Sequence, residues 1–238
     1  MNNSKPAQSA WAAVCGAVHA IPWKFWAYAG GGSFMYGSVI PFWFYGSGFL
    51  QRSHGYTVAE ADTLMVVPEG LLCVLSIPVG IVVDRFGFGL NVLQNAFAVC
   101  AVLIAASHAA LAAGGNPVAA VMCLGFAYAV CNQLMWAVFP RYCPAHLMSL
   151  GAGIAACFIN LSATIVPAVV GSVRVAPGVS AAEADVAMFS IFASLAMVSA
   201  AVIAALSWGV FERGGAKAGY TVVVEEEAKR MELEMDEV

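Results

Sequence analysis

Six long, almost uncharged stretches limit most strongly how this chain can fold. A helix of about 20 apolar residues crosses the roughly 30 Å hydrocarbon core of a bilayer, whereas a membrane-spanning strand needs only about 10 residues of alternating polarity. Backbone groups in lipid must find hydrogen bonds within their own segment. We therefore expect an all-α membrane protein with six transmembrane helices. The stretches are 22 to 26 residues long and cover residues 25–50, 62–83, 91–113, 117–139, 148–171 and 186–210.

The composition supports an integral membrane protein. Only 10% of the residues are charged and 61% are hydrophobic, whereas soluble domains are about 25% charged. Too few polar side chains remain to coat a water-facing surface, and the short links between the stretches leave no room for a soluble domain. We expect a segment 1–24 whose short apolar piece lies at the membrane interface, a bundle 25–210 and an acidic tail 211–238.

The lysines and arginines divide unevenly between the two sides of such a bundle. With the N-terminus inside, eight fall on the cytoplasmic side and two, Arg52 and Arg174, on the far side. An excess of basic residues marks the cytoplasmic side of multi-pass proteins. Both termini are therefore expected in the cytoplasm. The eight are Lys5, Lys24, Arg85, Arg141, Arg213, Lys217, Lys229 and Arg230.

A short charged loop joins the second and third stretches and contains Gly80, Asp84, Arg85 and Gly87. It resembles the loop signature of the major facilitator superfamily of transporters, Gly-x-Leu-x-Asp-Arg-x-Gly-Arg-Lys, which joins the second and third helices of each six-helix half. The resemblance implies that these four residues belong to a cytoplasmic gate. Positions 88 and 89 are Phe and Gly, where the family usually has two basic residues.

The resemblance also implies a fold and an activity. Residues 139–146 look like the connection between helices 10 and 11, so the chain resembles a C-terminal half. Residues 25–171 look closest to the lysosomal dipeptide-transporter branch, which favours short peptides as the solute. Such a half works by alternating access with a second six-helix bundle, either the missing half or another copy.

Polar residues inside the stretches are the candidates for contact with a solute. Glu69 is the only charged residue well inside a stretch, and a mid-membrane charge normally faces a cavity or a partner. Glu69 either recognises charge or couples protons, or it is a carboxyl that bonds a neighbouring helix. Gly30 to Gly32 and Pro41 either interrupt the first helix, as found at transporter substrate sites, or serve close packing, as Gly and Pro commonly do in membrane helices. The candidates that we expect to line a cavity with Glu69 are Tyr28, Tyr36, Asn132, Gln133 and Asn160.

Other functions were weighed against transport. The chain lacks the paired Asn-Pro-Ala motifs of aquaporins and the Gly-x-Ser-Gly nucleophile of rhomboid proteases, so we expect no enzyme. The seven cysteines have no metal-ligand spacing, and we expect no cofactor, no metal and no nucleic-acid partner. The expected partners are the lipid bilayer, a small-molecule solute and a second bundle. A non-transporting scaffold or regulatory subunit remains the alternative.

The location of the protein depends on one short pattern in the tail. Residues 219–223, Gly-Tyr-Thr-Val-Val, resemble a tail signal for lysosomal sorting. Lysosomal or endosomal membranes and the plasma membrane both remain open.

Overall fold

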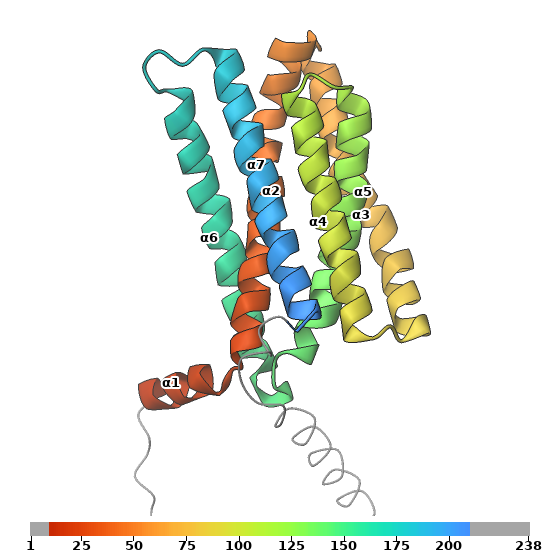
Figure 1. The fold of residues 1–238 in the computed structure, drawn as a ribbon, viewed down its shortest axis with the longest axis vertical. Helices are drawn as coiled ribbons and strands as arrows, with labels where there is room; N and C mark the ends of the chain where they lie inside the picture. The colour runs from red at the N-terminus through yellow and green to blue at the C-terminus, as the bar shows by residue number, and fades with distance from the viewer. Residues whose placement is uncertain (1–9, 210–238) are drawn as a thin grey trace, which may run out of the picture.

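The computed structural model describes residues 10–209, which form a bundle of six long helices and a separate short one (Figure 1). The short helix α1 lies crosswise at one end of the bundle, here called the proximal end. The connections 55–57, 113–116 and 175–180 lie at the opposite, distal end. The helices are α1 Ala10–Ala20, α2 Trp23–His54, α3 Val58–Phe86, α4 Leu90–Ala112, α5 Pro117–Val138, α6 Met148–Arg174 and α7 Ala181–Ser207, with two 3₁₀ turns, η1 Phe139–Arg141 and η2 Ala145–Leu147.

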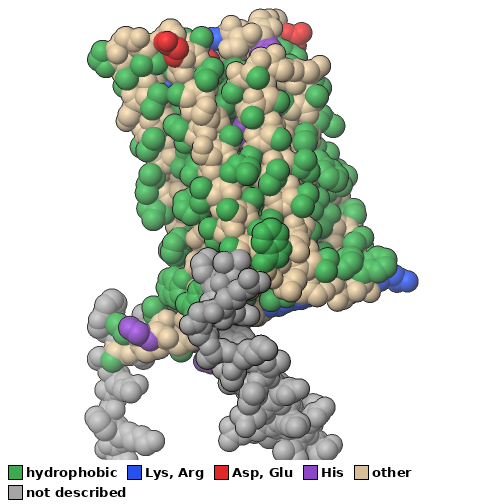
Figure 2. Space-filling view, viewed as in Figure 1, with side chains coloured by type: hydrophobic (Ala, Val, Ile, Leu, Met, Phe, Trp, Pro, Cys, Tyr) green, Lys and Arg blue, Asp and Glu red, His purple; other side chains and the backbone are tan. Residues whose placement is uncertain are grey.

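The helices confirm an all-α membrane protein. Helices α3 to α7 are long and apolar enough to cross a membrane by length and composition. At 32 residues α2 is also long enough, but its Gly, Ser and Tyr residues lower its hydropathy. On the face in Figure 2, charged side chains gather at the two ends, and the surface between them is largely hydrophobic. This distribution fits a multi-pass protein with its flanks in lipid.

Local capping extends the helices beyond the apolar stretches. Thr57 caps α3 in a capping box with Glu60, and Ser180 caps α7 in the same way with Glu183. Each box satisfies backbone N–H groups at a helix start. These helices therefore begin four or five residues before the apolar sequence does.

Helix α2 forms the centre of the bundle and is continuous. It packs against α7 and α6 and also touches α3 and α5, and 16 of its 32 residues are buried. The alternative of an interruption at Gly30 to Gly32 and Pro41 is therefore wrong. Glycines here permit close packing instead: a Cβ on Gly31 would lie 2.9 Å from Ile203, and one on Gly37 would lie 3.2 Å from Ser162.

Helices α3 and α6 lie at the flanks and are the least buried. Over the most apolar 18 residues of each helix, 11% of α3 and 17% of α6 are buried, compared with 50% of α4 and 56% of α5. Helix α4 packs against both α5 and α7, so these three helices have close neighbours within the bundle. The flanking helices thus leave most of their surface uncovered within the described part of the chain.

An ion network at the distal end joins three helices. The Asp185 carboxylate of α7, 5% exposed, lies 3.0 Å from the Arg52 guanidinium of α2 and 2.8 Å from that of Arg174 on α6. Arg174 also lies over the Tyr45 ring, 5.4 Å from its centroid. Asp185 lies one residue before the sixth apolar stretch of the sequence.

Candidate functional site

A group of polar side chains from three helices meets where α2, α3 and α5 come together. We call it the polar junction; it consists of Tyr36, Glu69, Ser76, Tyr128, Asn132 and Gln133. The Tyr36 hydroxyl of α2 donates a hydrogen bond to Asn132 Oδ1 of α5. The Gln133 amide donates to Ser76 Oγ of α3 at 2.9 Å. Hydrogen bonds therefore connect α5 to α2 and to α3 at this level.

Aromatic rings extend the polar junction toward the distal end. The Tyr128 ring lies edge-on to that of Tyr36, with 6.1 Å between centroids, and 5.6 Å from Trp43. The Glu69 carboxylate is close enough to Tyr128 for an electrostatic interaction. Glu69 is exposed, so its charge lies at the accessible edge of the junction. The structure thus brings together four of the six predicted solute residues: Tyr36, Glu69, Asn132 and Gln133.

Tyr28 lies apart from the polar junction, in the core. Its side chain is 1% exposed, and its hydroxyl donates to the backbone carbonyls of Leu134 and Met135 at 3.4 and 3.3 Å. Eight helical residues separate it from Tyr36, which turns the two side chains about 80° apart. Tyr28 therefore joins α2 to α5 and does not line an accessible surface in this conformation.

Asn160 also lies apart, on the outer side of α6. Its amide donates to the Ala156 carbonyl of its own helix at 2.8 Å, and the side chain is exposed. The α6 residues that meet α2 are Phe158, whose carbonyl accepts from Ser33 at 2.6 Å, and Ser162 beside Gly37. Each is two residues from Asn160, about 200° around the helix. Asn160 therefore points away from α2.

The gate residues end α3 at the proximal end. Gly87 adopts φ 55°, the left-handed conformation that reverses the chain after the helix. Gly80 lies within α3, and no described atom comes within 4 Å of its Cβ position. Asp84 and Arg85 are exposed and form no hydrogen bond or ion pair within residues 10–209. Arg141 donates to the Phe88 carbonyl at 3.0 Å and so ties the loop to η1.

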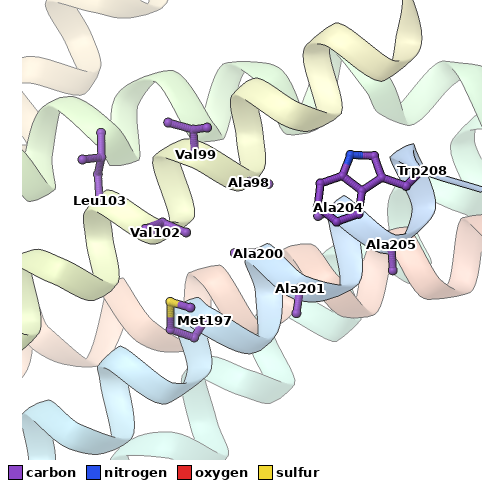
Figure 3. Close-up of a pocket in the computed structure, with 10 residues that line it drawn as sticks. All are labelled: Ala98, Val99, Val102, Leu103, Met197, Ala200, Ala201, Ala204, Ala205 and Trp208. Atoms are coloured by element: carbon purple, nitrogen blue, oxygen red, sulfur yellow. The ribbon is translucent and has the colours of Figure 1, made fainter. Parts of the chain in front are cut away.

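The cavity with the largest volume of those described lies elsewhere. It measures about 540 Å³, and its walls are formed by α4 and α7 (Figure 3). Its lining contains no charged or hydrogen-bonding side chain except the Trp208 indole. An apolar groove between two apolar helices suits lipid chains better than a polar solute. None of the predicted solute residues lines it.

Neither a metal-binding group among the described residues nor a comparison with known proteins defines the site further. Within residues 10–209, no group of three or more His, Cys, Asp or Glu side chains could hold a metal ion. No protein-family model matches the chain, and no curated protein matches it. The resemblance of the Asp84–Arg85 loop to the major facilitator superfamily therefore remains a prediction from the sequence.

Proposed function

We propose that this chain is a secondary transporter, or one six-helix half of one, that moves a small organic solute by alternating access. In this proposal α2 is the sixth membrane-crossing helix. The activity is transport and not an enzymatic reaction, and short peptides are the solute favoured by the resemblance of residues 25–171. The proximal end, which carries Asp84 and Arg85, is the cytoplasmic side.

The polar junction is the observation that carries this proposal. Side chains that need hydrogen bonds are costly in lipid unless they bond one another or face water or a ligand. Here Asn132 and Gln133 have partners on α2 and α3, whereas the Glu69 carboxylate is exposed beside them. An exposed charge next to ordered amides and phenols can recognise a polar solute that carries an amine.

The exposed sides of α3 and α6 support a second bundle as partner. These two helices flank α2, and at the polar junction the Glu69 side chain is exposed whereas Tyr36 and Tyr128 are buried. Another six-helix bundle placed against them would enclose the junction near the middle of the membrane, where transporters bind solutes between repeats. Transport would follow from rocking of one bundle against the other. The other half of a longer protein and a second copy of this chain both fit this role.

The charges of Asp84 and Arg85 fit a gate between the two bundles. Both lie exposed in the last turn of α3 and have no charged partner within the described residues. A second bundle that closes the cytoplasmic side would bring new partners to them. Gly87 fixes the direction in which the loop leaves α3.

Uptake into liposomes tests the proposal. Liposomes that contain the purified chain, alone or together with its second bundle, should take up labelled short peptides or another class of small organic solute. Asn132→Leu should reduce uptake strongly, because it removes the acceptor of the Tyr36 hydroxyl. The matched control is Asn95→Leu, since Asn95 is exposed on α4, away from the junction. Equal uptake by the two variants would refute a role for the junction.

A scaffold or regulatory subunit is the second candidate. It is favoured by Phe88 and Gly89, which replace the two basic residues of the gate signature. This function predicts no uptake by the chain under any condition and stable binding to an intact transporter. The membrane that holds the protein is either lysosomal or endosomal, or the plasma membrane. Residues 219–223, which resemble the sorting signal, lie outside the described part of the chain.

A further inference from the structure

One buried histidine lacks a hydrogen bond of normal geometry at either ring nitrogen, and its nearest polar group is the Ser38 backbone. His108 of α4 is 0% exposed, and neither Nδ1 nor Nε2 forms a hydrogen bond with a described residue. Buried polar groups are nearly always satisfied, and an exception calls for a function or for water. His108 lies in the third apolar stretch of the sequence, residues 91–113. The structure places it inside the core.

The surroundings of His108 are aromatic and contain few polar groups. The rings of Phe42, Phe189 and Phe192 surround it, with centroids 5.6, 6.0 and 5.3 Å away. Aromatic rings are the apolar groups best able to stabilise a nearby cation. The adjacent polar backbone is that of Ser38, one turn before Phe42, and the Ser38 hydroxyl also lacks a described partner.

A second cavity lies at the distal end and shares Phe189 with the surroundings of this histidine. We call it the distal cavity; it has a volume of about 270 Å³. Its walls are mainly apolar, but Ser53, His54 and Asp185 offer polar groups to water, and its volume is several times the roughly 30 Å³ that one water occupies in the liquid. The lining residues used below are Phe49, Ser53, His54, Leu111, Asp185 and Phe189.

Phe189 separates the distal cavity from His108. Its ring lines the cavity, contacts the His108 ring and lies 4.6 Å from the Phe49 ring. Phe192 and Phe42 contact His108 but do not line the cavity. Rotation of one phenyl ring would therefore connect the water of the cavity with the imidazole.

We propose that His108 is a proton-binding site inside the bundle, reached by water from the distal end through the distal cavity and past Phe189. A proton delivered by this water binds the free lone pair of the imidazole. The second ring nitrogen can then donate to the backbone at Ser38. The site lies among α2, α4 and α7, apart from the polar junction. It does not depend on the proposed transport; in a transporter it would separate the proton from the solute.

Few other titratable groups face this site. On α7, Asp185 lies one turn from Phe189 and is bound to Arg52 and Arg174. On α2, His54 lines the distal cavity. The adjacent part of α5, residues 117–124, contributes only Cys123, which is exposed. Protonation of His108 therefore has no carboxylate beside it to compensate the charge, and the aromatic rings and Ser38 must do so.

Deuterium exchange at the imidazole C2 position tests the proposal, because it requires a protonatable ring and access to water. The full chain in detergent or nanodiscs is placed in D₂O at several pH values, and each histidine is followed by mass spectrometry. His146, exposed on η2, is the internal reference. We expect His108 to exchange with a sigmoidal pH dependence. No exchange at His108 while His146 exchanges completely would overturn the proposal.

Two phenylalanine variants test the route. Phe189→Leu should accelerate exchange at His108 several-fold, because it opens the wall of the distal cavity. Phe192→Leu is the matched control, since it removes an equivalent ring contact without opening the cavity, and it should leave the rate near that of the unmodified chain. Equal rates in the two variants would overturn the route through Phe189.

Discussion

Asp185 holds three helices together through a single side chain. It accepts hydrogen bonds from Arg52 of α2 and Arg174 of α6, and its own side chain is almost fully buried. The two arginines close the last turns of their helices, where a positive charge also interacts favourably with the helix dipole. The carboxylate is thus the shared negative charge between two cations.

Removal of that charge should destabilise the bundle. We expect Asp185→Asn to lower the free energy of unfolding by about 2–3 kcal/mol, less than the roughly 3–5 kcal/mol for a fully buried pair, because 42% of the Arg52 side chain is exposed. The midpoint of thermal unfolding in detergent measures this change. Glu183→Gln is the control, because Gln also completes a capping box. If both variants lowered the unfolding midpoint by the same amount, the role of Asp185 would be contradicted.

Tyr28 and Tyr36 show what sequence could and could not predict about the site. Both lie in the same apolar stretch and both are buried, and nothing local separates a tyrosine that bonds backbone carbonyls from one that bonds a side chain of another helix. The difference arises from the rotation of α2 against α5, which sets one hydroxyl against backbone carbonyls and the other against Asn132. Residue type identified the candidates, but only the packing of whole helices sorted them.

The turn after α3 depends on one glycine. Gly87 has φ 55°, which costs an L-residue with a side chain about 1–2 kcal/mol. We therefore expect Gly87→Ala to lower the free energy of unfolding by about 1 kcal/mol. Gly89→Ala, two residues on at φ −60°, should have little effect. Thermal unfolding of the two variants in detergent makes the comparison, and an equal loss in both would show that the backbone conformation is not the cause.

Close contact between α3 and α5 depends on another glycine. A Cβ on Gly125 would lie 2.8 Å from Pro68 Cα, a backbone atom that cannot move alone. Overpacking of this kind costs about 1–3 kcal/mol, and we expect that loss for Gly125→Ala. The Gln133–Ser76 hydrogen bond should weaken as the helices separate. Gly153→Ala on α6, whose Cβ position has no described atom within 4 Å, should keep the stability of the unmodified chain. Thermal unfolding in detergent measures both variants, and equal stability would refute the close contact.

The positions of the helices could be predicted from the sequence. Their ends and the continuity of α2 could not be predicted as well. Apolar length alone located the cores of α3 to α7, because the bilayer sets that length. The starts of α3 and α7 were missed, since Thr57 and Ser180 extend them through polar residues. The continuity of α2 could not be predicted, because glycines fit either a break or close packing, and only the neighbouring helices at Gly31 and Gly37 decide between the two.

At the scale of the whole molecule, the helices differ in how much of their surface is buried. Helices α4, α5 and α7 pack into one body with α2, whereas α3 and α6 remain largely exposed at its flanks. The polar junction lies beside α3, and the apolar cavity lies between α4 and α7 (Figure 3). The side with the polar junction thus offers hydrogen-bonding groups and Glu69 beside exposed apolar residues of α3, whereas the side with the cavity is apolar throughout.

Two native cysteines offer the most direct test of this central claim. Cys73 and Cys123 are both exposed. Cys73 lies on α3, one turn from Glu69, whereas Cys123 lies on α5 two residues from Gly125, about 200° around the helix from the contact with α3. Labelling of the chain in intact membranes with a charged, membrane-impermeant maleimide, followed by peptide mass spectrometry, measures water access at each. We expect rapid labelling of Cys73 and little labelling of Cys123. Equal labelling of both, or no labelling of Cys73, would contradict water access at the side of the polar junction.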